Sequence, residues 1–207
     1  MKSKRAAQET PEPGWRDDPD VDLMQRVRDG DTVAFRELFT KYGEAVVNFA
    51  YRFVNSRPRA EELAQDAFLQ IYRARGRYEA KARFTTYLYR VVTNLCLNEL
   101  RRFDYQGRTE PLEGRPLENG EEGSRELADP AIPEVEDLLA GLETGARIKK
   151  VLDKLPPNQK SALLLSRVEG LSYQEVAECL ETTESAVKSL IFRATQTLRE
   201  ELADLLR

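Results

Sequence analysis

The sequence contains no histidine and only two cysteines among its 207 residues. Histidine is the side chain used most often as a general base and is a common zinc ligand, so both roles lack their usual residue. Cys96 and Cys179 lie far apart with no CxxC pair, which predicts two buried free thiols rather than a metal or redox site. The carboxylates are not paired as in hydrolases, and we expect no catalytic activity, no metal and no cofactor.

Long apolar runs are also absent. No segment approaches the roughly 18 apolar residues that cross a bilayer, and the N-terminal MKSKRAAQETPEP lacks the apolar core of a signal peptide. With 41% hydrophobic and 33% charged residues, the composition is typical of a soluble globular protein. We therefore expect a cytoplasmic protein that is not itself a membrane protein. No alternating apolar and polar run indicates a sheet, so the expected fold class is all-α.

The net charge of −4 is unevenly distributed. Residues 105–145 carry 3 basic and 11 acidic side chains, a net charge of −8, whereas 21–104 have +4 and 146–207 have +1. The acidic stretch is rich in Gly, Pro and Glu and has no helical periodicity before about Ile132, which is typical of a flexible linker. We predict two small helical domains, 21–104 and 146–207, joined by this acidic linker and preceded by a disordered tail, 1–20.

The first domain begins with two amphipathic helices. Apolar residues at helical spacing, Phe39 among them, predict a helix over about 35–53 that Asp31 caps and that ends near Arg57 and Pro58. A second helix is expected from Ala60 to about Arg75. Its apolar stripe includes Tyr72, and its free face carries Asp66, Leu69, Gln70 and Arg73.

The next stretch, ARFTTYLYRVVTNLCLNELRR at 82–102, predicts a third helix with two different faces. Phe84, Tyr87, Leu88, Val91, Val92 and Leu95 share the apolar face. Thr86, Arg90, Asn94, Asn98 and Arg101 fall toward the other. A polar face is most simply a solvated surface, and contact with another molecule is the alternative.

The second domain has the pattern of a helix-turn-helix. Pro156-Pro157 opens a helix that Gly170 closes, a capping box from Ser172 to Glu175 starts the next, and a short break at 181–183 precedes a further amphipathic helix. In this motif the second helix enters the DNA major groove N-terminus first. The side chains placed to reach DNA are Thr183, Glu184, Ser185, Lys188, Ser189, Phe192 and Arg193. A helix hairpin that serves only packing is the alternative.

Three motifs together resemble the extracytoplasmic-function group of bacterial RNA polymerase sigma factors. They are AEELAQDAFLQIYR, FTTYLYRVVTNLCLNELRR and LSYQEVAECLETTESAVKSLIFRA, in this order and with the acidic linker between the second and the third. The resemblance covers about residues 21–206. It implies that the protein binds core RNA polymerase, directs it to promoter DNA, and is controlled by an anti-sigma factor. The two domains would be sigma region two and sigma region four.

The resemblance also implies roles for individual residues. Polymerase would be bound by Asp66, Leu69, Gln70 and Arg73. The promoter minus-10 element would meet Arg77, Lys81, Arg83, Phe84, Thr85, Thr86, Asn94, Asn98, Arg101 and Arg102. The loop 77–83, together with Phe84, Thr85 and Thr86, would hold an unstacked base. The minus-35 element would meet the seven residues of the recognition helix named above. Linker residues Glu118, Glu121, Glu122 and Glu126 would stand in for RNA phosphates near the polymerase active site.

Some positions depart from the family pattern. Tyr87 stands where tryptophan is usual and, like Tyr72, is assigned to the core because it lies on an apolar stripe. Glu181 replaces a turn glycine, and Leu190 and Thr195 replace basic residues, which suggests weaker phosphate anchoring at the minus-35 element. A free-standing helix-turn-helix regulator would explain only residues 146–207. A helical adaptor would leave Lys188 and Arg193 unexplained.

Overall fold

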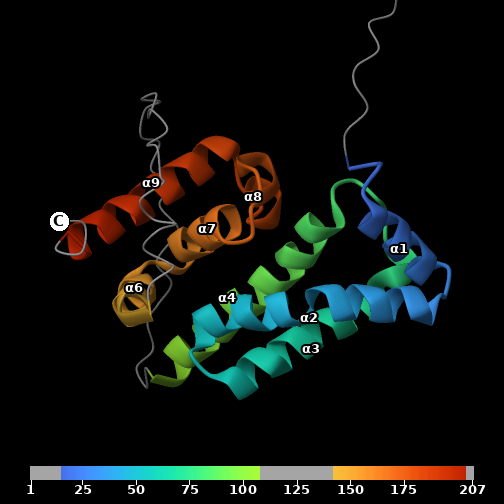
Figure 1. Ribbon diagram of the computed structural model, residues 1–207, viewed down its shortest axis with the longest axis horizontal. Coiled ribbons are helices and arrows are strands. Elements are labelled where there is room, and N and C mark those ends of the chain that lie inside the picture. Colours follow the sequence, from blue (N-terminus) through green and yellow to red (C-terminus); the bar gives the residue numbers. More distant parts are fainter. Residues whose placement is uncertain (1–14, 108–141, 204–207) are drawn as a thin grey trace, which may run out of the picture.

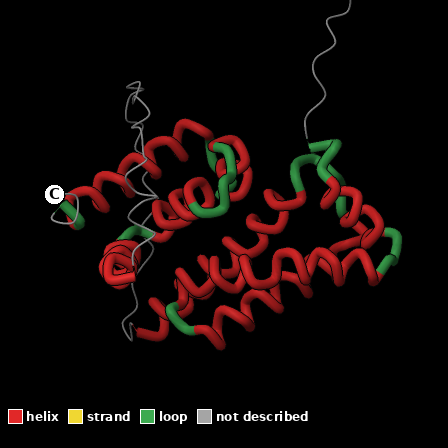
Figure 2. Tube along the Cα trace, in the orientation of Figure 1, coloured by secondary structure: helices red, strands yellow, loops and turns green. Residues whose placement is uncertain are grey.

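The computed structural model describes residues 15–107 and 142–203, and helices are the regular structure throughout these ranges (Figures 1 and 2). The N-terminal half contains α1 (Pro19–Arg28), α2 (Thr32–Val54), α3 (Arg57–Ala74), a 3-10 turn (Arg75–Arg77) and α4 (Phe84–Gly107). The C-terminal half contains α6 (Leu142–Lys154), α7 (Pro157–Arg167), α8 (Tyr173–Cys179) and α9 (Glu184–Glu201). The all-α prediction is confirmed. The linker glutamates Glu118, Glu121, Glu122 and Glu126 lie outside the described residues.

Local signals set the ends of α2. Asp31 caps its start, with Oδ1 accepting hydrogen bonds from the backbone N–H groups of Val33 at 2.8 Å and Ala34 at 3.1 Å. These bonds hold the pKa of the Asp31 carboxyl below its usual value. The helix ends at Asn55, which takes the left-handed conformation with φ 54°. The predicted end near Pro58 is therefore slightly late, since Pro58 lies in the first turn of α3, where its missing N–H is harmless.

Helix α1 lies partly within the segment expected to be a tail. Asp18 accepts a hydrogen bond from the Asp20 N–H at its start, and Val21, Met24 and Val27 are buried. The buried Asp20 carboxylate accepts hydrogen bonds from Lys41 Nζ at 2.6 Å and from the Tyr42 hydroxyl, both on α2. A carboxylate paired in this way ties α1 to α2.

Helix α4 completes the N-terminal core. Phe84, Leu88, Val92 and Cys96 are buried along one side, and Tyr89 packs its ring on Phe49 at 5.2 Å between centroids. Near the other end, the Arg59 guanidinium of α3 donates to both oxygens of the buried Glu99, at 2.6 and 2.8 Å. This bidentate pair lowers the pKa of Glu99 and fixes α3 against α4.

The C-terminal half follows the predicted helix-turn-helix. The capping box is present, since Ser172 Oγ accepts from the Glu175 N–H while the Glu175 carboxylate accepts from the Ser172 N–H. Gly170 has φ +70°, which the chain needs to leave α7. Glu181, in the turn before α9, has φ 52°, so a residue with a Cβ occupies the left-handed conformation there.

The two halves pack against each other. Helices α7 and α8 both contact α4, and Figure 1 shows the C-terminal half beside α4 on the side away from α3. The sequence predicts a linker between two domains but no contact between them.

Candidate nucleic-acid interface

The predicted recognition helix presents its first turns to solvent. Thr183, Glu184, Ser185, Lys188 and Arg193 are exposed, and Ser189 and Phe192 are half-buried. Glu184 and Lys188 form an ion pair one turn apart, with Nζ 3.1 Å from the carboxylate. A carboxylate acceptor and an ammonium donor side by side are the groups that read the cytosine amino group and the guanine O6 and N7 of one base pair.

Thr183 has a defined place at the start of α9. Its Oγ1 accepts a hydrogen bond from the Ala186 N–H at 3.2 Å, which makes it the N-cap. A hydroxyl that accepts one hydrogen bond can still donate its own proton. Thr183 can therefore cap the helix and contact a phosphate at the same time.

Two substitutions in this helix have structural explanations. Leu190 is half-buried and packs against the core. Thr195 is 1% exposed, and its hydroxyl has no hydrogen-bond partner among the residues that the structure describes. A side chain at 195 points into the core, so a cation there would not anchor phosphate in this packing. The weaker phosphate anchoring expected from Leu190 and Thr195 stays a prediction.

The basic residues predicted for the minus-10 element are exposed. Arg77, Lys81 and Arg83 lie on the segment that enters α4, and Lys81 pairs with Glu79 at 2.7 Å. Along α4 the exposed residues include Asn94, Asn98, Arg101 and Arg102. Arg101 donates to Asn98 Oδ1 at 3.1 Å, which keeps the two on the same edge of the helix.

Two other residues of the minus-10 group are buried. The Phe84 ring is 0% exposed and lies 5.5 Å from the Tyr42 ring, so it belongs to the core rather than to a base platform in this packing. Thr86, expected on the free face, is 3% exposed because α8 covers it. Thr85 is half-buried.

A small cavity opens beside these residues. It has a volume of about 100 Å³ and is lined by Tyr78, Thr86, Tyr87 and Arg90, with Glu178 of α8 at its edge. The rings of Tyr78 and Tyr87 lie 5.3 Å apart. Burial raises the pKa of Tyr78 to about 12, and its hydroxyl is buried with no partner among the described residues. Tyr78 lies within the loop 77–83 that the resemblance assigns to the unstacked base, although it was not among the individually predicted site residues.

The free face of α3 has the predicted exposure. Asp66, Gln70 and Arg73 are exposed, and Leu69 is 47% exposed. Phe39 of α2, expected in the apolar stripe, is 45% exposed, with its ring 4.9 Å from that of Phe68. Phe39 therefore adds exposed aromatic surface to the α2 and α3 pair, although it follows the helical spacing of the apolar stripe.

The residues that could supply other chemistry are structural. Burial raises the pKa of both Cys96 and Cys179 to about 12, so neither thiol is activated. Within 15–107 and 142–203, no three His, Cys, Asp or Glu side chains are grouped as a metal site would require. None of the helices in these ranges combines the length and the apolarity that crossing a membrane needs.

Comparison with known proteins extends these observations. The model of Sigma-70 region 2 matches residues 38–104, and that of Sigma-70, region 4 matches residues 145–198. The RNA polymerase sigma-H factor of Pseudomonas aeruginosa is 35% identical over 190 residues, which cover 91% of this chain and 96% of that protein. The ECF RNA polymerase sigma factor SigW of Bacillus subtilis is 30% identical over 88% of this chain and 96% of its own length.

Two solved structures have a similar fold at 22% identity. CnrH in complex with the cytosolic domain of CnrY has a TM-score of 0.63 and covers 91% of this chain and 97% of its own. The sigma factor RpoE in complex with the anti-sigma factor NepR from Bartonella quintana has a TM-score of 0.58 and covers 82% and 96%.

Proposed function

The chain belongs to the extracytoplasmic-function (ECF) group of sigma-70 RNA polymerase sigma factors, and we propose that it reads promoters through two surfaces, one on each half. As a member of this group, it binds core RNA polymerase and directs promoter-specific initiation of transcription. The observation that carries the proposal is the position of the exposed surfaces along the chain. The α3 face and the α4 edge lie in the region 2 match, and the start of α9 lies in the region 4 match.

The α3 face is the proposed polymerase-binding surface. Among the described residues, no hydrogen bond or ion pair within the chain engages Asp66, Gln70 or Arg73, and Leu69 keeps 47% of its surface exposed. A charged and apolar face that no intrachain contact uses is suited to a protein partner. Phe39, which lies on the neighbouring helix beside Phe68, extends the apolar part of this surface.

The α4 edge is the proposed minus-10 surface. Arg77, Lys81 and Arg83 would contact backbone phosphates as the strands separate, and Asn94, Asn98, Arg101 and Arg102 would hold the adjoining duplex. The cavity between Tyr78 and Tyr87 has aromatic walls and a buried hydroxyl, and both features are suited to an unstacked base.

The start of α9 is the proposed minus-35 reader. Glu184 and Lys188 would contact base edges, Thr183 would donate to a phosphate, and Ser185, Ser189, Phe192 and Arg193 would complete the contact. Residues 21–104 and 146–207 are thus the proposed functional domains, joined by the acidic linker.

Two further assignments follow from group membership. One solved relative of the same fold is held by an anti-sigma factor, which supports an anti-sigma factor as a partner of this chain. We place the protein in the cytoplasm, where transcription occurs. A free-standing helix-turn-helix regulator is not favoured, because it would use only residues 146–207.

Transcription with purified components tests the proposal. Core polymerase is mixed with the purified chain and genomic DNA fragments, and the 5′ ends of the transcripts are sequenced. We expect starts that share two upstream elements and that depend on the added chain. Starts that do not depend on it, or a chain that fails to co-purify with core polymerase, would disprove the proposed function.

A further inference from the structure

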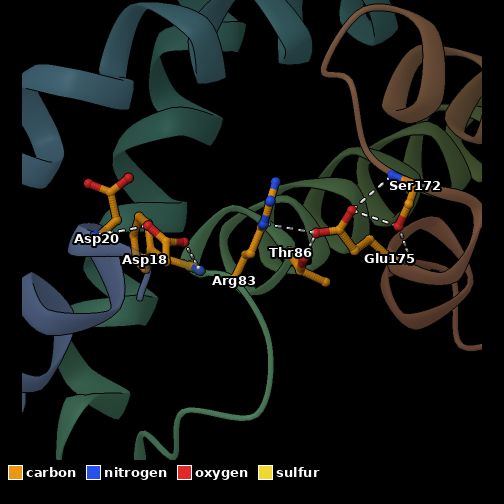
Figure 3. A network of polar contacts seen from close by, with 7 residues as sticks. Asp18, Asp20, Arg83, Thr86, Ser172 and Glu175 are labelled. Carbon is orange, nitrogen blue, oxygen red and sulfur yellow. Dashed lines mark hydrogen bonds and ion pairs between the residues drawn. The ribbon is translucent and has the colours of Figure 1, made fainter. Parts of the chain in front are cut away.

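The carboxylate of Glu175, at the start of α8, lies against the proposed minus-10 surface (Figure 3). The Thr86 hydroxyl donates to Glu175 Oε1 at 3.3 Å, and Arg83 Nε lies 3.9 Å from the same oxygen. Figure 3 shows both side chains directed at Glu175, whose other oxygen accepts from Ser172. A carboxylate therefore holds the place that a DNA phosphate would take between a hydroxyl and a guanidinium.

A second carboxylate of the C-terminal half contacts the N-terminal half further along α4. Glu169, two residues after the end of α7, accepts a hydrogen bond from the Tyr89 hydroxyl and lies 3.9 Å from Arg52 Nη1 of α2. Only 10% of the Glu169 side chain is exposed. Two groups from two different helices of the N-terminal half thus converge on one buried carboxylate of the C-terminal half.

Further polar contacts join the two halves. The Cys179 thiol of α8 donates to the Thr86 backbone carbonyl at 3.3 Å. On the other side, Asn55 Nδ2 donates to Asp153 Oδ2 at 2.9 Å. These polar contacts accompany apolar packing, since buried apolar residues of both halves belong to one cluster.

We propose that the C-terminal half masks the promoter-reading face of α4 in the free protein, with Glu175 and Glu169 as the latch. DNA and α8 cannot both occupy the space over Thr86, so the halves must separate before the minus-10 surface is used. This inference rests on the proposed function of α4 as a DNA surface. The C-terminal half would thus compete with DNA for the same surface of α4.

Charge is what makes this competition specific. At the proposed DNA surface the latch places the Glu175 carboxylate against Arg83, whereas Glu169 is held mainly by the Tyr89 hydroxyl and lies 3.9 Å from Arg52. A phosphate carries the same sign as the Glu175 carboxylate, so promoter DNA can replace it on Arg83 without leaving that cation unpaired. The state without DNA also keeps its cations paired, which suits an equilibrium between two states of similar free energy.

A charge-swap experiment tests the latch. Arg52→Glu sets two carboxylates against each other, Glu169→Arg sets two guanidinium groups against each other, and the double variant restores an opposite pair. Neither residue belongs to the proposed DNA or polymerase surfaces. Glu200→Arg is the matched control, because it makes the same charge change on α9, where Glu200 accepts a hydrogen bond only from Gln196 among the described residues.

The protein contains its own reporter of opening. Trp15, the only tryptophan, lines a cavity of about 730 Å³ together with Arg83 of the N-terminal half and Arg167, Ser172 and Tyr173 of the C-terminal half. Trp15 is half-buried, and separation of the halves would remove the C-terminal side of this cavity, so the ring should become more exposed and its emission should shift to longer wavelength. Small-angle scattering of the full chain gives the accompanying change in radius of gyration.

Binding is measured on the free protein with a fluorescent single strand that carries the minus-10 element mapped from the transcripts. We expect both single variants to open and to bind the strand at least about five-fold more tightly, a typical coupling between two sites. The double variant and Glu200→Arg should remain near wild type. Variants that open without binding the strand more tightly would show that the C-terminal half does not cover the minus-10 surface. Single variants that stay closed would show that Arg52 and Glu169 do not hold the halves together. A wild-type holoenzyme that initiates at no promoter would instead disprove the proposed function, whatever the state of the latch.

Discussion

Glu184 and Lys188 form an ion pair across the first exposed turn of α9, with 3.1 Å between the ammonium and the carboxylate. The pair orients Lys188 before any DNA is present. Lys188→Ala should therefore relax the preference at one minus-35 base pair by about 1–3 kcal/mol, because lysine donates to guanine edges. The measurement compares binding of holoenzyme to a library of single-base minus-35 variants.

Thr183→Ala is the natural contrast to that variant. It removes a phosphate donor and an N-cap, so binding should weaken for all sequences alike, and stability should fall by about 1 kcal/mol. Base-preference profiles of Lys188→Ala that match wild type would remove Lys188 from the base-reading site.

The α3 face should bind polymerase without contributing to the fold. Asp66→Arg combined with Leu69→Ala should abolish binding to core polymerase, because the change reverses a charge and removes an exposed apolar side chain on one face. Helical content and thermal melting should stay close to wild type, since surface changes usually alter stability by less than about 0.5 kcal/mol. Co-purification with core polymerase is the measurement, and Asp22→Arg, on the exposed side of α1, is the control. Normal holoenzyme assembly by the double variant would move the site to another face.

Local features of this fold could be predicted from the sequence because each depends on neighbours in the chain. Asp31 and Ser172 act on backbone groups two or three residues away, and the structure has both caps where the pattern places them. Thr183 caps α9 in the same way, although the sequence predicted only its place at the helix start. Helix α1 was missed because its apolar residues Val21, Met24 and Val27 are separated by charged and polar residues in a short segment.

Contacts between distant segments could not be predicted in the same way. Thr86 and Glu175 are 89 positions apart, and no local pattern indicates that α8 covers a polar residue of α4. Phe39 is a similar case, since its helical position matches the apolar stripe while the packing of α2 on α3 leaves its ring half exposed. Periodicity indicates which residues share a face but not how much of that face a neighbour covers.

The turn before α9 offers a test of backbone strain. Glu181 has φ 52°, a conformation that costs a residue with a Cβ about 1 kcal/mol and costs glycine much less. Glu181→Gly should therefore raise the free energy of unfolding by about 1 kcal/mol, measured by urea denaturation. Glu181→Ala retains the Cβ and should show no such gain. An equal gain in both variants would mean that the side chain, not the backbone, is responsible.

Thr195 offers a test of whether a buried hydroxyl without a hydrogen-bond partner destabilises the protein. It is 1% exposed with no hydrogen-bond partner among the described residues, and an unsatisfied buried donor costs about 1–3 kcal/mol. Thr195→Val replaces the hydroxyl with a methyl of similar size and should stabilise the protein by about 1 kcal/mol. Thr195→Ser keeps the hydroxyl and should not. Destabilisation by valine, seen in the thermal melting of the full chain, would indicate a hydrogen bond that forms in solution.

The packing of the two halves should strengthen as pH falls from neutral toward the ordinary pKa of glutamate, about 4.3. Burial raises the pKa of Glu169 above its ordinary value in the closed protein, although the Tyr89 hydroxyl of α4 and the Arg52 guanidinium of α2 both oppose the shift. When the halves separate, Glu169 is solvated and its pKa returns toward about 4.3. The closed state therefore binds the proton more tightly, and by linkage its advantage is complete below the ordinary pKa and is lost as pH rises through the raised one.

Glu169→Gln separates this effect from the titration of other carboxylates. Glutamine stays neutral at every pH and keeps an oxygen that can accept from Tyr89, so the variant should be at least as closed as wild type at pH 7.5 and should respond less to acid. Trp15 emission, recorded for both proteins at constant ionic strength, follows the closed fraction. Equal responses to pH in wild type and Glu169→Gln would show that the proton is taken up elsewhere. A wild-type protein that opens on acidification would show that the ion pair with Arg52 outweighs the cost of burying the carboxylate.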